Sequence, residues 1–262
     1  PAAGYPFDFA LSPDGKTLAV HLQPKRPVAK KGEPLEAPSP DGTRVGLYDA
    51  TTFAHLRDLK ADVEFGTALA FAPDGKVLGV AYRATDAGQP VGGVVEFDPA
   101  TGRELRRCAY HAKEKGGTPR INRIAYSPDG ARVVIVGGTG IPTGPNTLRI
   151  VGAVHYWDRK GSGVDITYVA NESDEFTAGV FSADGRRFYL GSRGATQRTG
   201  RVGGSRAFWY ASKAQCWDTT GAGWWFLDVH WSADGEFGRV STMALDPTGT
   251  RLLVADEAGV WA

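Results

Sequence analysis

A short segment recurs five times along the chain, and this repetition constrains the fold more than any other feature. Each copy has an apolar stretch, a tight turn with a glycine, and a second apolar stretch. The copies are FALSPDGKTLAV (9–20), LAFAPDGKVLGV (69–80), IAYSPDGARVVIV (124–136), GVFSADGRRFYLG (179–191) and MALDPTGTRLLVA (243–255). Asp binds nearby backbone amides and Gly tolerates positive φ, so each copy is predicted to be a β-hairpin.

The turn residues recur because the turns require them, so we interpret their carboxylates as structural and not catalytic. These residues are Asp14, Gly15, Asp74, Gly75, Asp129, Gly130, Asp184 and Gly185.

A second pattern follows each hairpin: an aromatic residue ends a strand, and an Asp opens a turn. It occurs as GLYDATT (46–52), VEFDPATG (96–102), HYWDRKGSG (155–163), CWDTTGAG (216–223) and, cut short, GVWA (259–262). In the third and fourth copies the pair is Trp157 with Asp158 and Trp217 with Asp218. A further strand follows in the first four copies. The repeating unit is therefore four antiparallel strands, which we call a, b, c and d.

A four-stranded unit repeated at this period is typical of a β-propeller blade. The sequence predicts one all-β domain over residues 1–262, a β-propeller or propeller fragment with five units. The expected blades cover about residues 7–60, 66–110, 121–170, 176–231 and 240–262, the last one incomplete. A non-repetitive β-sandwich is the alternative, and four complete strand–turn–strand–aromatic–Asp cycles argue against it.

The stretch SPDGKTLAV followed by DGTRVGLYDATT resembles the WD-repeat β-propellers and their bacterial relatives. The resemblance implies a non-enzymatic platform for protein interactions. Two departures matter. None of the five histidines follows a glycine, so the hydrogen-bond tetrad of that family is not expected. The blades are also longer than the usual ~40–45 residues. Both departures fit a divergent bacterial propeller.

The extra length lies between strands b and c of each unit. The inserted segments are 21–40, about 84–92, 137–150 and 192–207. Because strands alternate in direction, these connections share one face of the disc with the d–a connections. We expect long loops there, and long loops on a rigid scaffold commonly carry function.

Basic residues gather in two of these segments and are the candidate binding residues. They are Lys25, Arg26, Lys30 and Lys31 in the first blade, and Arg193, Arg198, Arg201 and Arg206 in the fourth. Such a patch suits a carboxylate, a phosphate or an acidic protein segment. The alternative is that these loops are solvated and their charges maintain solubility. The proline-rich stretch 24–40 is either a spacer or a polyproline ligand.

Other function classes find little support. The net charge of +1 gives no global attraction for nucleic acid. No apolar run approaches the ~20 residues of a membrane helix, so no membrane insertion is expected. No catalytic motif occurs, and Cys108 and Cys216 have no metal-type spacing, so we expect no enzyme activity, no metal and no cofactor. The cysteine usage leaves the compartment open, with the cytoplasm favoured over the periplasm.

Two functional hypotheses follow. The first is a protein-interaction scaffold that binds through the b–c/d–a face. The second is an accessory propeller of a bacterial enzyme, with a small-molecule site on its axis or a gating role for a catalytic domain elsewhere in the parent chain. The last unit lacks a strand d, so the expected partner is another protein or further domains of the parent chain. A five-bladed ring closed by residues 1–6 is the alternative.

Overall fold

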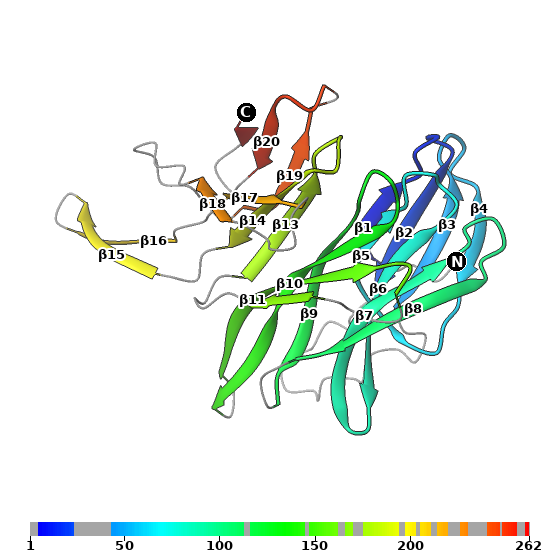
Figure 1. Cartoon of the computed structure of the whole chain (residues 1–262). Coiled ribbons are helices and arrows are strands. Elements are labelled where there is room, and N and C mark those ends of the chain that lie inside the picture. Colours follow the sequence, from blue (N-terminus) through cyan, green and yellow to red (C-terminus); the bar gives the residue numbers. More distant parts are fainter. Residues whose placement is uncertain are drawn as a thin grey trace.

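The computed structural model describes residues 5–23, 43–112, 116–144, 147–161, 166–169, 175–193, 197–202, 205–210, 214–219, 226–229, 240–246, 248–255 and 260–261. Every regular element in these ranges is a β-strand (Figure 1), which confirms the all-β prediction. The same ranges contain no helix that is long and apolar enough to cross a membrane.

The first three sheets are antiparallel, and their spatial order follows the order of the chain. The first contains β1 (Tyr5–Leu11), β2 (Thr17–Gln23), β3 (Arg44–Asp49) and β4 (His55–Leu59). The second contains β5 (Glu64–Phe71), β6 (Leu78–Asp86), β7 (Gln89–Phe97) and β8 (Glu104–His111). The third contains β9 (Thr118–Tyr126), β10 (Arg132–Gly144), β11 (Thr147–Asp158) and β12 (Ile166–Val169).

The fourth sheet contains an insertion. It is built from β13 (Glu175–Phe181), β14 (Arg187–Arg193), β17 (Ala214–Asp218) and β18 (Phe226–Val229). Between β14 and β17 the chain forms a separate two-stranded sheet, β15 (Gln197–Val202) and β16 (Ser205–Tyr210). The fifth sheet, as far as the structure describes it, has β19 (Thr242–Leu245), β20 (Leu252–Ala255) and β21 (Val260–Trp261).

The sheets follow one another around an arc, as the blades of a propeller do. The first strand of each sheet contacts the first strand of the next: β1 meets β5, β5 meets β9, β9 meets β13, and β13 meets β19. In Figure 1 the first sheet (blue to cyan) lies at the right and the last sheet (red) at the upper left. Because one face of a blade is buried only by its neighbour, this stacking is what stabilises each sheet.

The hydrophobic core accordingly lies in layers between neighbouring sheets. Ala19 and Leu47 of the first sheet pack with Leu69 and Phe97 of the second. Between the second and third sheets the layer includes Val94, Cys108, Ile124 and Trp157, and between the third and fourth it includes Val134, Val136, Phe188 and Trp217. Ala178 and Met243 belong to the layer between the fourth and fifth sheets.

The a–b turns have the chemistry that their sequence indicates. In the first, Ser12 donates its hydroxyl to the Asp14 carboxylate, which also accepts the backbone amide of Lys16. Gly15 has a φ of 71°, a conformation that side chains with a Cβ rarely adopt. In the next three hairpins Asp74, Asp129 and Asp184 likewise accept a backbone amide two residues on, and Gly75, Gly130 and Gly185 likewise have positive φ. The serine hydroxyl bond recurs at Asp129 and Asp184.

The expected loops between strands b and c are wrong for three of the inserted segments, about 84–92, 137–150 and 192–207, which mostly form strands instead. β6 and β7 stay paired out to Asp86 and Gln89, joined by a two-residue turn in which Ala87 and Gly88 both have positive φ. β10 and β11 stay paired out to Gly144 and Thr147. Segment 192–207 mostly forms β14, β15 and β16. Of segment 21–40, residues 24–40 lie outside the described residues.

Candidate binding site on the hairpin face

Two long hairpins define one face of the arc. The β6–β7 and β10–β11 hairpins project to the same side, at the bottom of Figure 1, while the a–b turns lie at the top. We call this side the hairpin face; it carries the outer parts of the two hairpins, residues 83–92 and 137–150. It is the elaborated b–c/d–a face that the strand alternation predicts.

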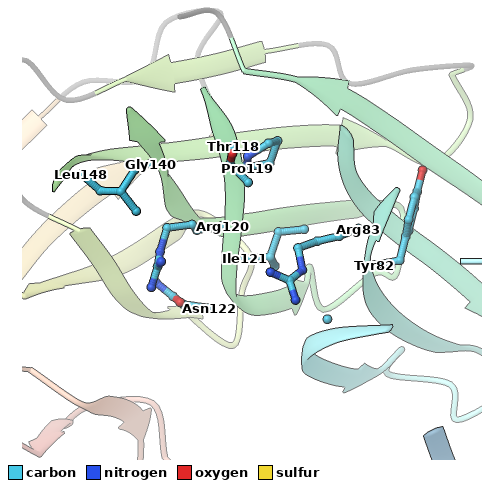
Figure 2. A pocket seen from close by; sticks show the side chains of 10 residues that line it. Tyr82, Arg83, Thr118, Pro119, Arg120, Ile121, Asn122, Gly140 and Leu148 are labelled. Carbon is cyan, nitrogen blue, oxygen red and sulfur yellow. The ribbon is translucent and has the colours of Figure 1, made fainter. Parts of the chain in front are cut away.

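A pocket of about 240 Å³ opens at the base of these hairpins, where the second sheet meets the third (Figure 2). Gly66, Tyr82 and Arg83 line it from the second sheet. Residues 118–122 of β9, with Gly140 of β10 and Leu148 of β11, line it from the third sheet. In Figure 2 the side chains of Arg120 and Asn122 lie on one side of β9, and those of Ile121 and Arg83 lie on the other.

Arg83 is held by a weak contact. Its Nη2 lies 2.8 Å from Oε1 of Glu64, but about half of the Arg83 side chain and more than half of that of Glu64 are exposed. An exposed ion pair of this kind contributes about 0–1 kcal/mol, because water screens it and two long side chains must be ordered. A carboxylate from a ligand can therefore replace Glu64 beside this guanidinium at small cost.

Arg120 and Asn122 are fixed more firmly, by the neighbouring sheet. Nε of Arg120 donates to Oε1 of Glu175 over 3.1 Å, and the amide of Asn122 donates to the same oxygen over 3.0 Å. Asn122 also donates to the backbone carbonyl of Phe176. The Glu175 side chain is only 9% exposed, so these bonds link the third and fourth sheets at a residue that also lines the pocket.

Other lining side chains include the uncharged phenol of Tyr82 and the aliphatic side chains of Ile121 and Leu148. The Tyr82 hydroxyl donates to the carbonyl of Cys108, and burial raises the pKa of Tyr82 to about 12. Ile121 and Leu148 supply aliphatic surface. Arg83 and residues 118–119 also line a second, more open hollow on the β5 and β7 side, so Arg83 is accessible from two directions.

The sequence-predicted basic residues are not part of this pocket. Lys25, Arg26, Lys30 and Lys31 lie outside the described residues. Arg193 ends β14, Arg198 and Arg201 lie on β15, and Arg206 lies on β16 opposite Arg201. Figure 1 places β15 and β16 at the far left, away from the β6–β7 hairpin. Their role in binding stays a prediction.

The sequence-predicted structural residues lie at the ends of strands and in the core. Trp157 is buried between the second and third sheets, and Trp217 between the third and fourth. Asp158 accepts the backbone amide of Lys160 in the c–d turn, and Asp218 pairs with Arg187 in the β14–β17 ladder.

Sequence reasoning missed Arg83, Arg120, Asn122 and Glu175. The available signal was a polar residue at the outer end of an otherwise apolar strand. Arg83 follows the apolar run of β6, and Arg120 and Asn122 alternate with apolar residues on β9.

A buried carboxylate lies between the second and third sheets, and it is structural. Glu96 is fully buried; Nε of Arg106 lies 2.7 Å from its Oε2, and Nε of Arg159 lies 2.8 Å from its Oε1. The Tyr126 hydroxyl donates to Glu96 as well, over 2.7 Å. Two cations and a hydroxyl thus compensate the cost of burying the charge. No group of three or more His, Cys, Asp or Glu side chains suited to a metal occurs in the described ranges.

No family model matches the sequence, and no curated protein matches it. Solved structures do match. A chain of hydrazine synthase from Kuenenia stuttgartiensis has a TM-score of 0.53 and 17% identity, over 97% of this chain and 74% of that one. The Cps50 (Swd1) β-propeller domain from Myceliophteria thermophila has a TM-score of 0.59 and 15% identity, over 97% of this chain and 63% of that one.

TolB from Acinetobacter baumannii is a third neighbour, with a TM-score of 0.51 and 16% identity over 97% of this chain and 49% of TolB. At these identities the likeness concerns the fold alone. Together with the successive antiparallel sheets, it identifies the fold as a β-propeller, as predicted. The WD-repeat and bacterial parts of the resemblance stay hypotheses.

Proposed function

We propose that this chain is a non-enzymatic protein-interaction propeller, which binds an acidic segment of a partner on its hairpin face. The pocket between the second and third sheets receives a carboxylate side chain of that segment. One observation carries the proposal: Arg83 and Arg120 line the same pocket at the base of the two projecting hairpins.

The charges support an anionic ligand. Guanidinium groups recognise carboxylates through paired hydrogen bonds, and each hydrogen bond to a charged group contributes about 1.5–3 kcal/mol. The exposed Arg83–Glu64 pair contributes about 1 kcal/mol at most, so its loss to a ligand carboxylate costs little.

The size of the pocket favours a side chain over a cofactor. Pockets for drug-sized ligands and cofactors have volumes of about 300–1,000 Å³. The volume here is about 240 Å³, and the aliphatic surface of Ile121 and Leu148 suits the methylene groups of a glutamate.

The titratable groups that line the pocket support binding over catalysis. They are two guanidiniums and the Tyr82 phenol, whose pKa burial raises to about 12. That raised pKa keeps the Tyr82 phenol protonated near neutral pH, whereas a general acid or base needs a pKa near the working pH.

A second candidate is an accessory propeller of an enzyme that binds a small carboxylate in the same pocket. The two guanidiniums suit a free dicarboxylate as well as a side chain. The test therefore includes both kinds of ligand.

The proposal is tested by fluorescence anisotropy with labelled octapeptides that contain two glutamates, beside matched peptides with glutamine. We expect the glutamate peptides to bind and Arg83→Glu to weaken them at least tenfold. Arg103→Glu is the matched control, because Arg103 is exposed in the c–d turn of the second sheet, on the opposite face. Arg120→Lys tests the second guanidinium while it keeps the charge beside Glu175.

The outcomes separate the candidates. Equal weakening by Arg83→Glu and Arg103→Glu, or equal binding of the glutamine peptides, contradicts a carboxylate site at the pocket. Displacement of the peptide by free glutarate at micromolar concentration favours the small-molecule candidate over the peptide site.

A further inference from the structure

The first sheet exposes a row of large apolar side chains on one face. Phe9 and Leu11 alternate along β1 and therefore point to the same side of the sheet. Their exposed fractions are 72% and 54%. Phe7 lies in a β-bulge between Pro6 and Asp8, and its ring contacts that of His21.

We call the side of a sheet that carries Phe9 and Leu11 in the first sheet its leading face. In the second to fifth sheets the leading face is turned toward the preceding sheet. The opposite side, turned toward the following sheet, is the trailing face.

The turn glycines fix which residues of the other sheets are equivalent to Phe9. Phe9 stands six residues before Gly15, and the same spacing selects Leu69, Ile124 and Met243. These three are 7%, 6% and 8% exposed, because each packs against the preceding sheet. In the fourth sheet the position is Gly179, and Phe188 fills the space beside it. Only in the first sheet is this position open to solvent, among the described sheets.

The neighbouring strands show the same contrast. Val20 pairs with Phe9, and Leu18 pairs with Leu11, so both share the leading face. Both are partly exposed. The residues at the same positions of the next three sheets are fully buried: Leu78 and Val80, Val133 and Ile135, Phe188 and Leu190.

The faces that meet between sheets differ in composition. Leading faces contribute side chains such as Ile124, Tyr126 and Phe181, whereas trailing faces contribute many alanine and valine side chains beside larger ones such as Leu47 and Tyr110. The trailing-face residues include Ala19 and Val45 of the first sheet, Ala68, Ala81 and Val94 of the second, and Val134 and Val136 of the third. A surface that buries Phe9 and Leu11 in the same way is a sheet face rich in alanine and valine.

We propose that the leading face of the first sheet docks a further propeller blade that is not among residues 1–262, through an alanine- and valine-rich trailing face. A Phe side chain carries about 150–250 Å² of surface, so the open Phe9, together with Leu11, is a strong site for burial. The proposal goes beyond the proposed function and does not depend on it.

Other occupants fit the face less well. Segment 24–42 contains only Val28 and Leu35 as large aliphatic residues, together with five prolines, so its composition differs from that of the trailing faces. The chain's own fifth sheet lies at the far end of the arc in Figure 1. The chain matches 63% of the Swd1 propeller domain over 97% of its own length, so a propeller of that size has room for further blades.

The experiment supplies such a blade. A copy of residues 118–174, whose trailing face carries Val134 and Val136, is fused directly before Tyr5. By the glycine spacing Tyr5 is equivalent to Glu175, so the junction reproduces the native step from the third to the fourth sheet. In a Cys216→Ser background, Phe9→Cys reports access to the leading face through its rate of maleimide labelling. Phe53→Cys is the control, because Phe53 is 68% exposed in a c–d turn.

We expect the thiol of Phe9→Cys to label at least tenfold more slowly in the fused chain than in the 262-residue chain, with Phe53→Cys unchanged. Equal rates at position 9 in both chains overturn the proposal. So does protection at position 9 in the unfused chain: concentration-independent protection assigns the face to a segment of the chain itself, and concentration-dependent protection assigns it to a second copy.

A stability measurement covers the case in which the introduced thiols perturb folding. Phe9→Ser is expected to leave the urea midpoint of the 262-residue chain unchanged and to lower that of the fused chain. Leu69→Ser, at the equivalent and already buried position, is expected to lower the midpoint in both. A Phe9→Ser effect of equal size in the two chains contradicts docking.

Discussion

At the scale of single residues, hydrogen bonds to the turn carboxylates explain why Asp recurs in the a–b turns of the repeating units. In the third hairpin the Ser127 hydroxyl and the Ala131 amide both donate to Asp129. These bonds favour the ionised carboxylate, so they lower the pKa of Asp129 below its ordinary value of 3.8. The turn aspartates Asp14 and Asp184 have pKa values lowered by the same two kinds of bond.

The lowered pKa of Asp129 predicts how the stability contributed by this residue changes with pH. Since the pKa of Asp129 is lower in the folded state, the unfolded state binds more protons as the pH falls. The stabilisation is fully present above pH 3.8 and is lost as the pH falls through the lowered pKa. Asp129→Asn should therefore cost most stability above pH 4 and progressively less toward pH 2. Urea unfolding at a series of pH values measures this; a difference that stays constant from pH 5 to pH 2 would sink the idea.

Replacement of the buried Glu96 should lower the free energy of unfolding more than replacement of an exposed carboxylate. Removal of one partner from a buried ion pair typically costs 3–5 kcal/mol, because it leaves an uncompensated charge. Glu96→Ala leaves Arg106 and Arg159 without their shared carboxylate, so we expect a loss of about 3–5 kcal/mol in unfolding free energy. Glu64→Ala is the control, and its exposed pair predicts a loss of about 1 kcal/mol or less. Similar losses for the two variants would contradict this account of Glu96.

At the scale of elements, turn chemistry is local, and this is why the hairpins and the fold class could be predicted from the sequence. The b–c connections could not, because their extra length suggested loops, whereas two of them are long hairpins that even contain prolines. Pro90 lies in β7 and Pro142 in β10, both in the hairpin tips: β8 pairs with β7 only from Val91 onward, and β9 pairs with β10 only as far as Gly140. A proline lacks an amide donor, and a two-stranded tip has no second neighbour that needs one.

The pocket escaped prediction for a different reason. Arg83 ends an apolar run in the second sheet, and Arg120 lies 37 positions later, in the third sheet. Nothing local links the two residues. Only the packing of one sheet against the next brings them to one pocket, and that packing depends on the whole arc.

Close packing within the third sheet gives a prediction at this scale. A Cβ at Gly137 would overlap the backbone carbonyl of Arg120, which cannot move aside without disturbing β9. Gly137→Ala should therefore destabilise the protein by about 1–3 kcal/mol, as overpacking typically does. Gly140→Ala in the same strand is the control, since its Cβ would lie 3.8 Å from the nearest atoms. Urea denaturation compares the two, and equal midpoints would show that β9 adjusts freely.

At the scale of the whole molecule, stability is the sum of contacts between neighbouring sheets, because no sheet buries both faces by itself. The layer between the second and third sheets combines an apolar cluster with the Glu96 network. Trp157 and Cys108 lie within it at 2% exposure each. We therefore expect this layer to be among the last parts of the molecule to open.

The two cysteines make that expectation measurable. Burial raises the pKa of the Cys108 thiol to about 12, so at pH 8 it is both inaccessible and protonated, and only a thiolate attacks a disulfide reagent. Cys216, on β17 of the fourth sheet, is only partly buried. With Ellman's reagent the native chain should show one fast thiol, lost in Cys216→Ser, and one slow thiol, lost in Cys108→Ser. In Cys216→Ser, the slow rate should rise with urea in parallel with global unfolding, because the layer that covers Cys108 opens only when neighbouring sheets separate. A fast reaction of Cys108 without urea would instead place local opening between the second and third sheets.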